Sequence, residues 1–116
     1  GSWADDYDFN LLSETSDAWF LEGTRKSADS AYDSVKLTVD KKLELPLLAS
    51  FAKAKEGGYY KELSFSNHRD FGGRIRAGEM LMKNTKKGSS TLVLLKEASF
   101  DVALEDRLFD PSRFDK

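Results

Sequence analysis

Ser66, His68 and Asp70 are the residues of this chain whose types match a Ser-His-Asp catalytic triad. They stand in one short stretch, in which Asn67 to Asp70 predicts a turn, and His68 is the only histidine. A working triad is assembled from separate elements around a pocket, and titratable groups acquire a function from their surroundings. We therefore interpret this stretch as a solvated turn and expect no catalytic residue.

Metal ions and cofactors have no matching pattern either. The chain contains no cysteine and one histidine, which argues against the usual zinc sites. The densest acidic group, formed by Asp5, Asp6 and Asp8, lacks the glycine and the distal glutamate of a calcium-binding loop. The glycines fall in predicted turns and bulges instead of a Gly-rich loop that cradles a phosphate. We expect neither a metal site nor a cofactor.

A set of apolar side chains remains as the candidate binding site. Met80 and Met82 fall on one face of a predicted strand, and methionine suits promiscuous apolar ligands. The run from Leu92 to Leu95 is apolar on both faces, so one side is expected to meet a helix or a partner and the other an acyl chain. Burial of such a chain stabilises binding by about 0.8 kcal/mol per methylene. Unless they form a closed core without room for a ligand, the predicted ligand-lining residues are Trp19, Leu21, Val35, Leu37, Leu63, Phe65, Met80, Met82, Val93 and Leu95.

Several segments that would position these side chains alternate between apolar and polar residues, as half-buried β-strands do. The clearest runs from Tyr32 to Asp40. In the strand predicted from Tyr59 to Ser66 we expect Tyr59, Lys61, Leu63 and Phe65 on one face. The other predicted strands are Tyr7 to Glu14, Ala18 to Arg25, Gly78 to Asn84 and Thr91 to Ala103, the last of them unusually long.

Turn residues separate these strands. Gly57-Gly58 predicts a hairpin turn and Gly72-Gly73 a bulge or sharp bend. Pro46 cannot donate to a ladder, so it marks an edge, a bulge or a strand start. Consecutive hairpins predict a mainly β fold, a curved antiparallel meander that forms part of an incomplete barrel. Its open edges invite pairing with a second copy, which would give a homodimer.

Length and composition fit one β domain over residues 3–116, with Gly1-Ser2 as the remnant of a tag. Hydrophobic residues make up 40% of the 116 residues and charged residues 33%. The net charge of −2 argues against a nucleic-acid partner, because such binders carry a basic excess. No apolar run approaches the roughly 18 residues that a membrane-spanning helix needs.

The end of the chain carries a motif that resembles a known family. Leu104, Asp106, Phe109, Pro111 and Phe114 match the closing segment of LolA-like proteins, the outer-membrane lipoprotein-sorting family. Further matches to the strands and turns of that family are Tyr32-Asp33-Ser34-Val35, Val39-Asp40, Leu45-Pro46-Leu47 and Tyr60-Lys61-Glu62-Leu63. The resemblance covers residues 7 to 114 and is a pattern of strands and turns, without a catalytic signature.

The resemblance implies that this sheet wraps around helices and holds lipid. The chain would then be the C-terminal half of a longer secreted protein of the periplasm or cell envelope. Its function would be that of a non-enzymatic carrier or binding domain for a lipid or an acylated protein. An envelope transporter or an outer-membrane receptor would be its partner.

Three alternatives stay open, because function belongs to sites and not to folds. The same fold can serve a protein-sensing module of the envelope, which a flat, dry sheet face would favour. It can serve a cofactor-free enzyme, which a small polar pocket near Arg74, Arg76 or His68 would favour. It can also be a purely structural domain.

Overall fold

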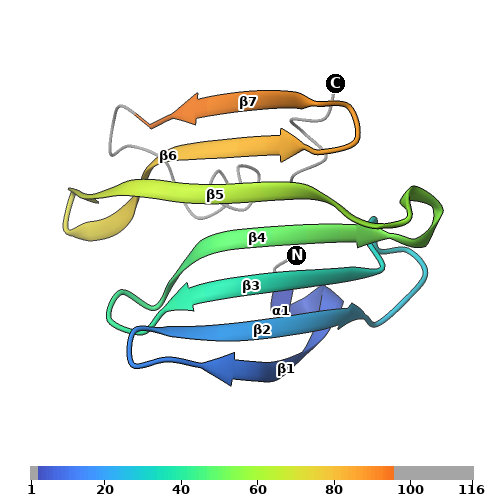
Figure 1. Cartoon of the computed structure of the whole chain (residues 1–116). Helices are drawn as coiled ribbons and strands as arrows, with labels where there is room; N and C mark the ends of the chain where they lie inside the picture. The colour runs from blue at the N-terminus through green and yellow to red at the C-terminus, as the bar shows by residue number, and fades with distance from the viewer. Residues whose placement is uncertain (1–2, 96–116) are drawn as a thin grey trace.

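The computed structural model describes residues 3–95, which form one antiparallel sheet with almost no helix (Figure 1). The strands are β1 (Tyr7–Glu14), β2 (Ala18–Arg25), β3 (Ser34–Asp40), β4 (Leu45–Lys53), β5 (Gly58–Phe71), β6 (Arg74–Asn84) and β7 (Ser89–Leu94). A one-turn helix, α1 (Trp3–Asp6), precedes them, and a 3-10 turn, η1 (Ala54–Glu56), joins β4 to β5.

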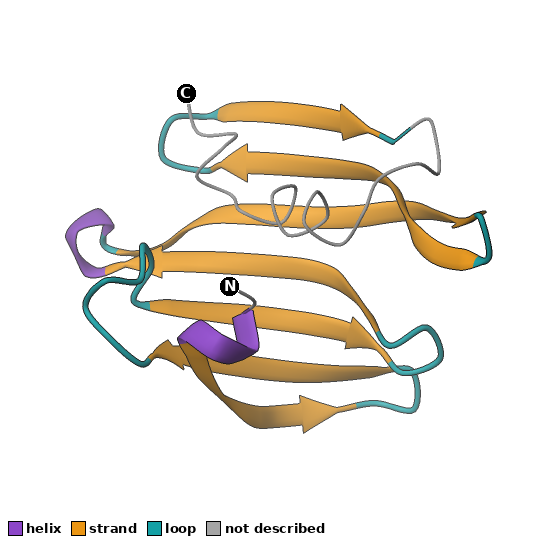
Figure 2. Cartoon of the chain, turned by 180° about the vertical axis from the view of Figure 1, so that it is seen from behind, coloured by secondary structure: helices purple, strands orange, loops and turns teal. Residues whose placement is uncertain are grey.

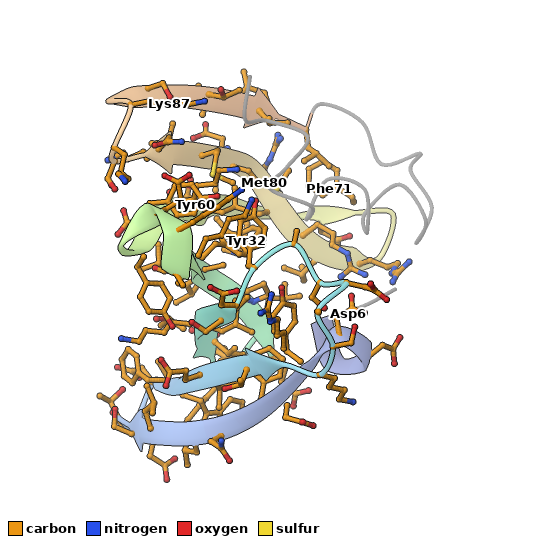
Figure 3. The ribbon with its side chains drawn as sticks, turned by 90° about the vertical axis from the view of Figure 1, so that its right-hand side faces the viewer. Asp6, Tyr32, Tyr60, Phe71, Met80 and Lys87 are labelled. Atoms are coloured by element: carbon orange, nitrogen blue, oxygen red, sulfur yellow. The ribbon has the colours of Figure 1, made fainter. Side chains whose placement is uncertain are left out.

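The seven strands pair in the order of the chain, β1 to β7, and every pair is antiparallel. Within the described residues β1 and β7 are the two edges, so the sheet is not closed. The sheet is curved, and α1 and the loop between β2 and β3 lie on one side of it (Figures 2 and 3). The predicted mainly β meander is confirmed.

Local patterns fixed several strand limits correctly. The first two predicted strands coincide with β1 and β2, and β3 begins two residues after Tyr32. Pro46 stands at a bulge, one of the three positions predicted for it. Val39 pairs with Pro46 and Thr38 with Leu48, which leaves Leu47 as the extra residue. Gly57 and Gly58 turn between η1 and β5 with positive φ angles of 84° and 120°.

The predicted turn from Asn67 to Asp70 is wrong, because β5 continues to Phe71. Asn67 adopts a left-handed φ of 54°, yet Ser66 still pairs with Glu79 and His68 with Ala77. Glycine in the facing strand permits this, since a Cβ on Gly78 would lie 2.6 Å from the Asn67 carbonyl oxygen.

The true turn falls at Gly72-Gly73, with φ angles of 65° and 90°, where we expected a bulge or bend. As a result β6 begins at Arg74 and not at Gly78. The last described strand begins at Ser89, two residues earlier than predicted, and ends at Leu94. The predicted continuation to Ala103 and the closing motif from Leu104 to Phe114 lie outside the described residues.

One face of the sheet, which we call the inner face, carries the core. Cross-strand pairing places one apolar residue from each of five strands in a row across it: Leu21, Leu37, Ala49, Leu63 and Met82. A parallel row brings together Gly23, Val35, Phe51, Lys61 and Asn84. Paired residues share a face, so the inner face is continuous from β2 to β6.

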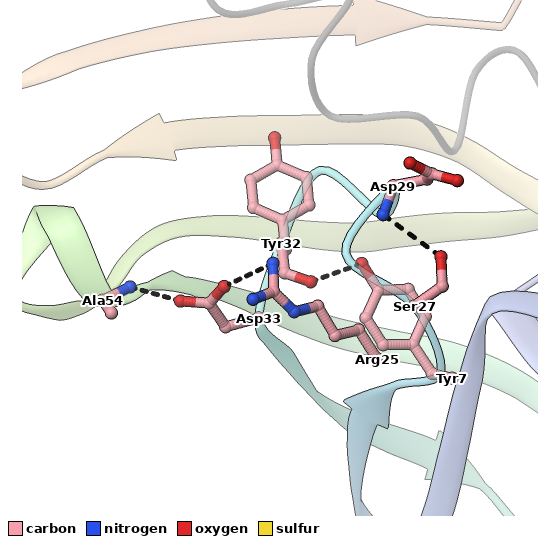
Figure 4. A network of polar contacts seen from close by, with 7 residues as sticks. All are labelled: Tyr7, Arg25, Ser27, Asp29, Tyr32, Asp33 and Ala54. Carbon is pink, nitrogen blue, oxygen red and sulfur yellow. Dashed lines mark hydrogen bonds and ion pairs between the residues drawn. The ribbon is translucent and has the colours of Figure 1, made fainter.

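The loop between β2 and β3 is fastened to the inner face by a polar network (Figure 4). The Tyr7 hydroxyl donates to the Tyr32 carbonyl at 3.1 Å, and Arg25 forms an ion pair with Asp33 at 3.0 Å. The Asp33 carboxylate also accepts a hydrogen bond from the Ala54 amide. These bonds hold the Tyr32 ring over the sheet, 5.0 Å from the Phe51 ring.

Substitution of Gly78 tests the close approach of β5 and β6 at Asn67. In Gly78→Ala the new Cβ meets backbone, the Asn67 oxygen at 2.6 Å, so we expect a loss of about 1–3 kcal/mol in the free energy of unfolding. Gly23→Ala is the matched control, because its Cβ meets the Phe9 ring, which can rotate away. Urea unfolding measures both, and an equal or smaller loss for Gly78→Ala would contradict this account of β5.

Candidate functional site

The structure brings the predicted ligand-lining residues together on the inner face. Six are buried and four are half-buried. The buried group is Val35, Leu37, Leu63, Phe65, Met80 and Met82, and the half-buried group is Trp19, Leu21, Val93 and Leu95. Whether these side chains line a ligand remains a prediction.

The two methionines link the centre of this face to its β7 edge. Met82 pairs with Leu63 and Met80 pairs with Phe65 on one side and Val93 on the other. Both methionines are nearly fully buried. Because methionine adapts its shape, this is the part of the face best able to accommodate an inserted chain.

The run from Leu92 to Leu95 is apolar on both sides, as the sequence indicated. Val93 and Leu95 pack against the core, whereas Leu92 and Leu94 point outward and are about half exposed, at 57% and 50%. The outer side of β7 is therefore an apolar strip at an edge of the described sheet.

Sequence reasoning missed a buried cation at one end of the inner face. Lys61 is 2% exposed, and its ammonium donates to the Tyr32 hydroxyl at 3.0 Å. The same ammonium lies 5.4 Å from the ring centroids of Tyr32 and Tyr60, a distance at which a cation is attracted to an aromatic face. Asn84, opposite Lys61 in the ladder, is also buried.

The alternation of side chains along β5 indicated only part of the burial of Lys61. Lys61 shares its face with Leu63 and Phe65, as predicted, whereas Tyr59 does not. Phe51 pairs with Lys61 and Ala52 with Tyr59, so Tyr60 is an extra, bulged residue. Tyr60 is consequently buried and Tyr59 is exposed, with its hydroxyl bonded to Glu22 at 2.9 Å.

The serine, histidine and aspartate near the end of β5 do not form a catalytic triad. Ser66, His68 and Asp70 occupy alternate positions of one strand, spaced by roughly 7 Å, which is too far for hydrogen bonds between them. The Asp70 carboxylate instead accepts a bond from the Gly73 amide at 2.6 Å and supports the turn. Within the described residues the buried His68 Nε2 has no hydrogen-bond partner.

A small polar pocket near Arg74, Arg76 or His68 would favour an enzyme, and the structure separates His68 from the two arginines. His68 pairs with Ala77 and Arg69 with Arg76. Neighbouring residues of a strand point to opposite faces, so His68 and Arg76 lie on opposite sides of the sheet.

Among residues 3–95 no group of three or more His, Cys, Asp and Glu side chains is placed to hold a metal ion. None of their helices is long and apolar enough to cross a membrane.

Comparison with solved structures identifies the fold. A domain described as that of an outer membrane lipoprotein-sorting protein from Vibrio parahaemolyticus is 26% identical, with a TM-score of 0.74 over 97% of this chain and 49% of that one. A DUF1329 family protein from Desulfovibrio piger is 28% identical, with a TM-score of 0.75 over 94% and 47%. The resemblance to LolA-like proteins is thus confirmed at the level of the fold.

A LolA superfamily protein from Nitrosomonas europaea shares the fold at 22% identity, with a TM-score of 0.64 over 82% of this chain and 48% of that one. The chain therefore spans about half the length of these structures. A family model described as "Uncharacterized protein" matches residues 1–116. No curated protein matches the chain.

Removing the Tyr32 hydroxyl tests the buried lysine. Tyr32→Phe leaves the Lys61 ammonium without the acceptor at 3.0 Å, and we expect a loss of about 1.5–3 kcal/mol in the free energy of unfolding. Tyr59→Phe is the control, because it removes an exposed hydroxyl bonded to Glu22 and should cost well under about 1 kcal/mol. Equal losses in the two variants would show that the Lys61 contact contributes little.

Stability at alkaline pH tests the buried hydrogen bond from the Tyr7 hydroxyl to the Tyr32 carbonyl. Burial, aided by the nearby Asp6 carboxylate, raises the pKa of the Tyr7 hydroxyl above its ordinary 10.0. Above pH 10.0 the unfolded chain loses this proton first, so stability falls as pH rises toward the folded pKa, by up to about 1.4 kcal/mol per pH unit.

Urea unfolding at several pH values measures this slope. Tyr7→Phe should make this slope shallower without removing it. Partial burial of Tyr59, together with the nearby Glu22 carboxylate, also raises the pKa of the Tyr59 hydroxyl. An unchanged slope in Tyr7→Phe would refute the assignment.

Proposed function

Because this chain belongs over residues 1–116 to the family described as "Uncharacterized protein" and has a LolA-like fold, we propose that it binds lipid or acylated protein. It acts as a non-enzymatic carrier or binding domain and holds acyl chains on the inner face. The setting is the periplasm or cell envelope, with an envelope transporter or an outer-membrane receptor as partner.

The continuous apolar row across the inner face is the observation that carries this proposal. Leu21, Leu37, Leu63 and Met82 stand side by side on four strands, with Ala49 completing the row on β4. A chain lying across the strands would touch every member without needing a polar partner.

Acyl binding on such a face is driven by removal of methylenes from water, at about 0.8 kcal/mol each. A ligand has to enter between side chains that already pack together, so entry begins where they are half exposed. Trp19 and Leu21 on β2, and Val93 and Leu95 by β7, are the half-buried members on the two sides of the buried centre.

A second candidate, a partner-binding module, is favoured by the two edges. Leu11 and Leu12 on β1 and Leu92 and Leu94 on β7 are each at least half exposed. Exposed edge strands offer unpaired backbone groups to another chain, including a second copy of this one. In that function the outer side of β7, and not the inner face, would meet the partner.

Native mass spectrometry of the purified chain, before and after organic extraction, is the first test. We expect added mass in the range of fatty acids or phospholipids that disappears on extraction. The reason is that an apolar ligand held on the inner face survives purification when many methylenes are buried. Bare chain in both samples, together with no uptake of added dodecanoate, would contradict lipid binding.

Neighbouring residues of β7 then separate the two candidates. Val93→Gln places an amide on the inner face beside Met80, and we expect dodecanoate binding to weaken by about tenfold. Leu92→Gln makes the same change on the outer side and should leave binding unchanged. Loss of dimerisation in Leu92→Gln with intact dodecanoate binding in Val93→Gln would favour the partner-binding module.

A further inference from the structure

The β5–β6 hairpin carries three arginines on one side. Arg69 pairs with Arg76, and Phe71 pairs with Arg74. Because paired residues share a face, as do alternate residues of a strand, all three guanidinium groups start from inner-face positions. The ring of Phe71 is buried and lies beside the Arg69 guanidinium.

Arg69 is held in a defined place. Its guanidinium donates to the Leu95 carbonyl at 2.7 Å and lies 5.0 Å from the Phe71 ring centroid. It reaches Leu95 by crossing β6 above Gly78, where an added Cβ would come within 2.9 Å of Arg69 Nε. A planar cation fixed in this way loses little side-chain entropy when it binds a ligand.

Arg74 and Arg76 are close enough to affect each other. Burial and the like charge of Arg74 lower the pKa of Arg76 below its usual range. Arg74 is exposed and Arg76 is half-buried, so the pair meets solvent at the rim of the face. An anion placed between them would reduce their mutual repulsion.

The arginines adjoin the apolar part of the inner face. Along β6 the inner positions run from Arg74 and Arg76 through Gly78 to Met80 and Met82. A molecule with its charged end at the hairpin could therefore extend directly over the methionines. This arrangement of charge beside apolar surface fits an amphiphile better than a free ion.

We propose that Arg69, Arg74 and Arg76 bind the anionic head group, a carboxylate or a phosphate, of an amphiphile whose chain lies on the inner face. This inference rests on the proposed function and adds head-group selectivity to it. The fork of donors on a guanidinium matches both anions, and these charge-assisted bonds are among the strong ones.

Ligands matched in chain length separate the head group from the chain. Calorimetry on the 116-residue chain compares dodecyl phosphate, dodecanoate, dodecanol and inorganic phosphate. We expect both anionic amphiphiles to bind at least about tenfold more tightly than dodecanol, and inorganic phosphate to bind far more weakly. Added salt should reduce the difference.

Paired variants locate the effect. Arg74→Gln with Arg76→Gln should remove the preference for the anions and leave dodecanol binding unchanged. Lys83→Gln is the control on the same strand, because Lys83 is exposed at an outward-facing position and its loss should change neither. Should the Gln pair fail to fold, Arg74→Lys with Arg76→Lys keeps the charge without the fork and should retain only part of the preference.

The outcomes are distinct. If dodecanol binds as tightly as dodecyl phosphate, or the preference survives in the Gln pair, the head-group site is refuted while lipid binding stands. If inorganic phosphate binds as tightly as dodecyl phosphate, the arginines bind a free anion and the inference fails. If no amphiphile binds, the proposed function fails and the inference with it.

Discussion

The register of the seven strands is the constraint on which the inner face depends. Side chains alternate along a strand, so a slip of one residue would move an entire apolar set to the opposite face. Pairing of Leu21 with Leu37, and of Leu63 with Met82, keeps those sets aligned across the sheet. The bulges on β4 and β5 absorb single extra residues without disturbing this alignment. Every feature considered for binding follows from that alignment.

An open sheet with one apolar face must be covered, and in the described residues the loop before β3 covers part of it. Tyr32 is the centre of that cover, because its ring packs on Phe51, its carbonyl accepts from Tyr7 and its hydroxyl accepts from Lys61. A buried ammonium is costly unless it is hydrogen-bonded, so Lys61 and Tyr32 depend on each other. At this end of the inner face the contacts of Tyr32 stabilise the fold and close the face to a ligand.

Much of the sheet could be predicted because alternation is a local signal. The limits of β1 and β2 and the shared face of the ten apolar residues followed from it. The bulge at Pro46 was one of three possibilities that the missing N–H of proline predicted. The turn after Ser66 was misplaced because Asn67 takes a left-handed conformation inside a strand, which only the facing Gly78 permits. That contact joins residues eleven apart in the chain and has no local signal. The burial of Tyr60 likewise depends on how β4 pairs with β5.

A cationic group lies at each end of the apolar face. The surroundings of the two groups differ, so they are not equally accessible to an anion. Lys61 is almost fully buried beneath Tyr32, so an anion could reach it only after the loop moved and the tyrosine bond broke. Arg69 and Arg74 are exposed, and an anion bound there keeps part of its hydration. Desolvation opposes buried ion pairs strongly and exposed ones weakly. In the proposed function the hairpin is therefore the end at which a head group would be exchanged, and the tyrosine end is the one that would stay closed.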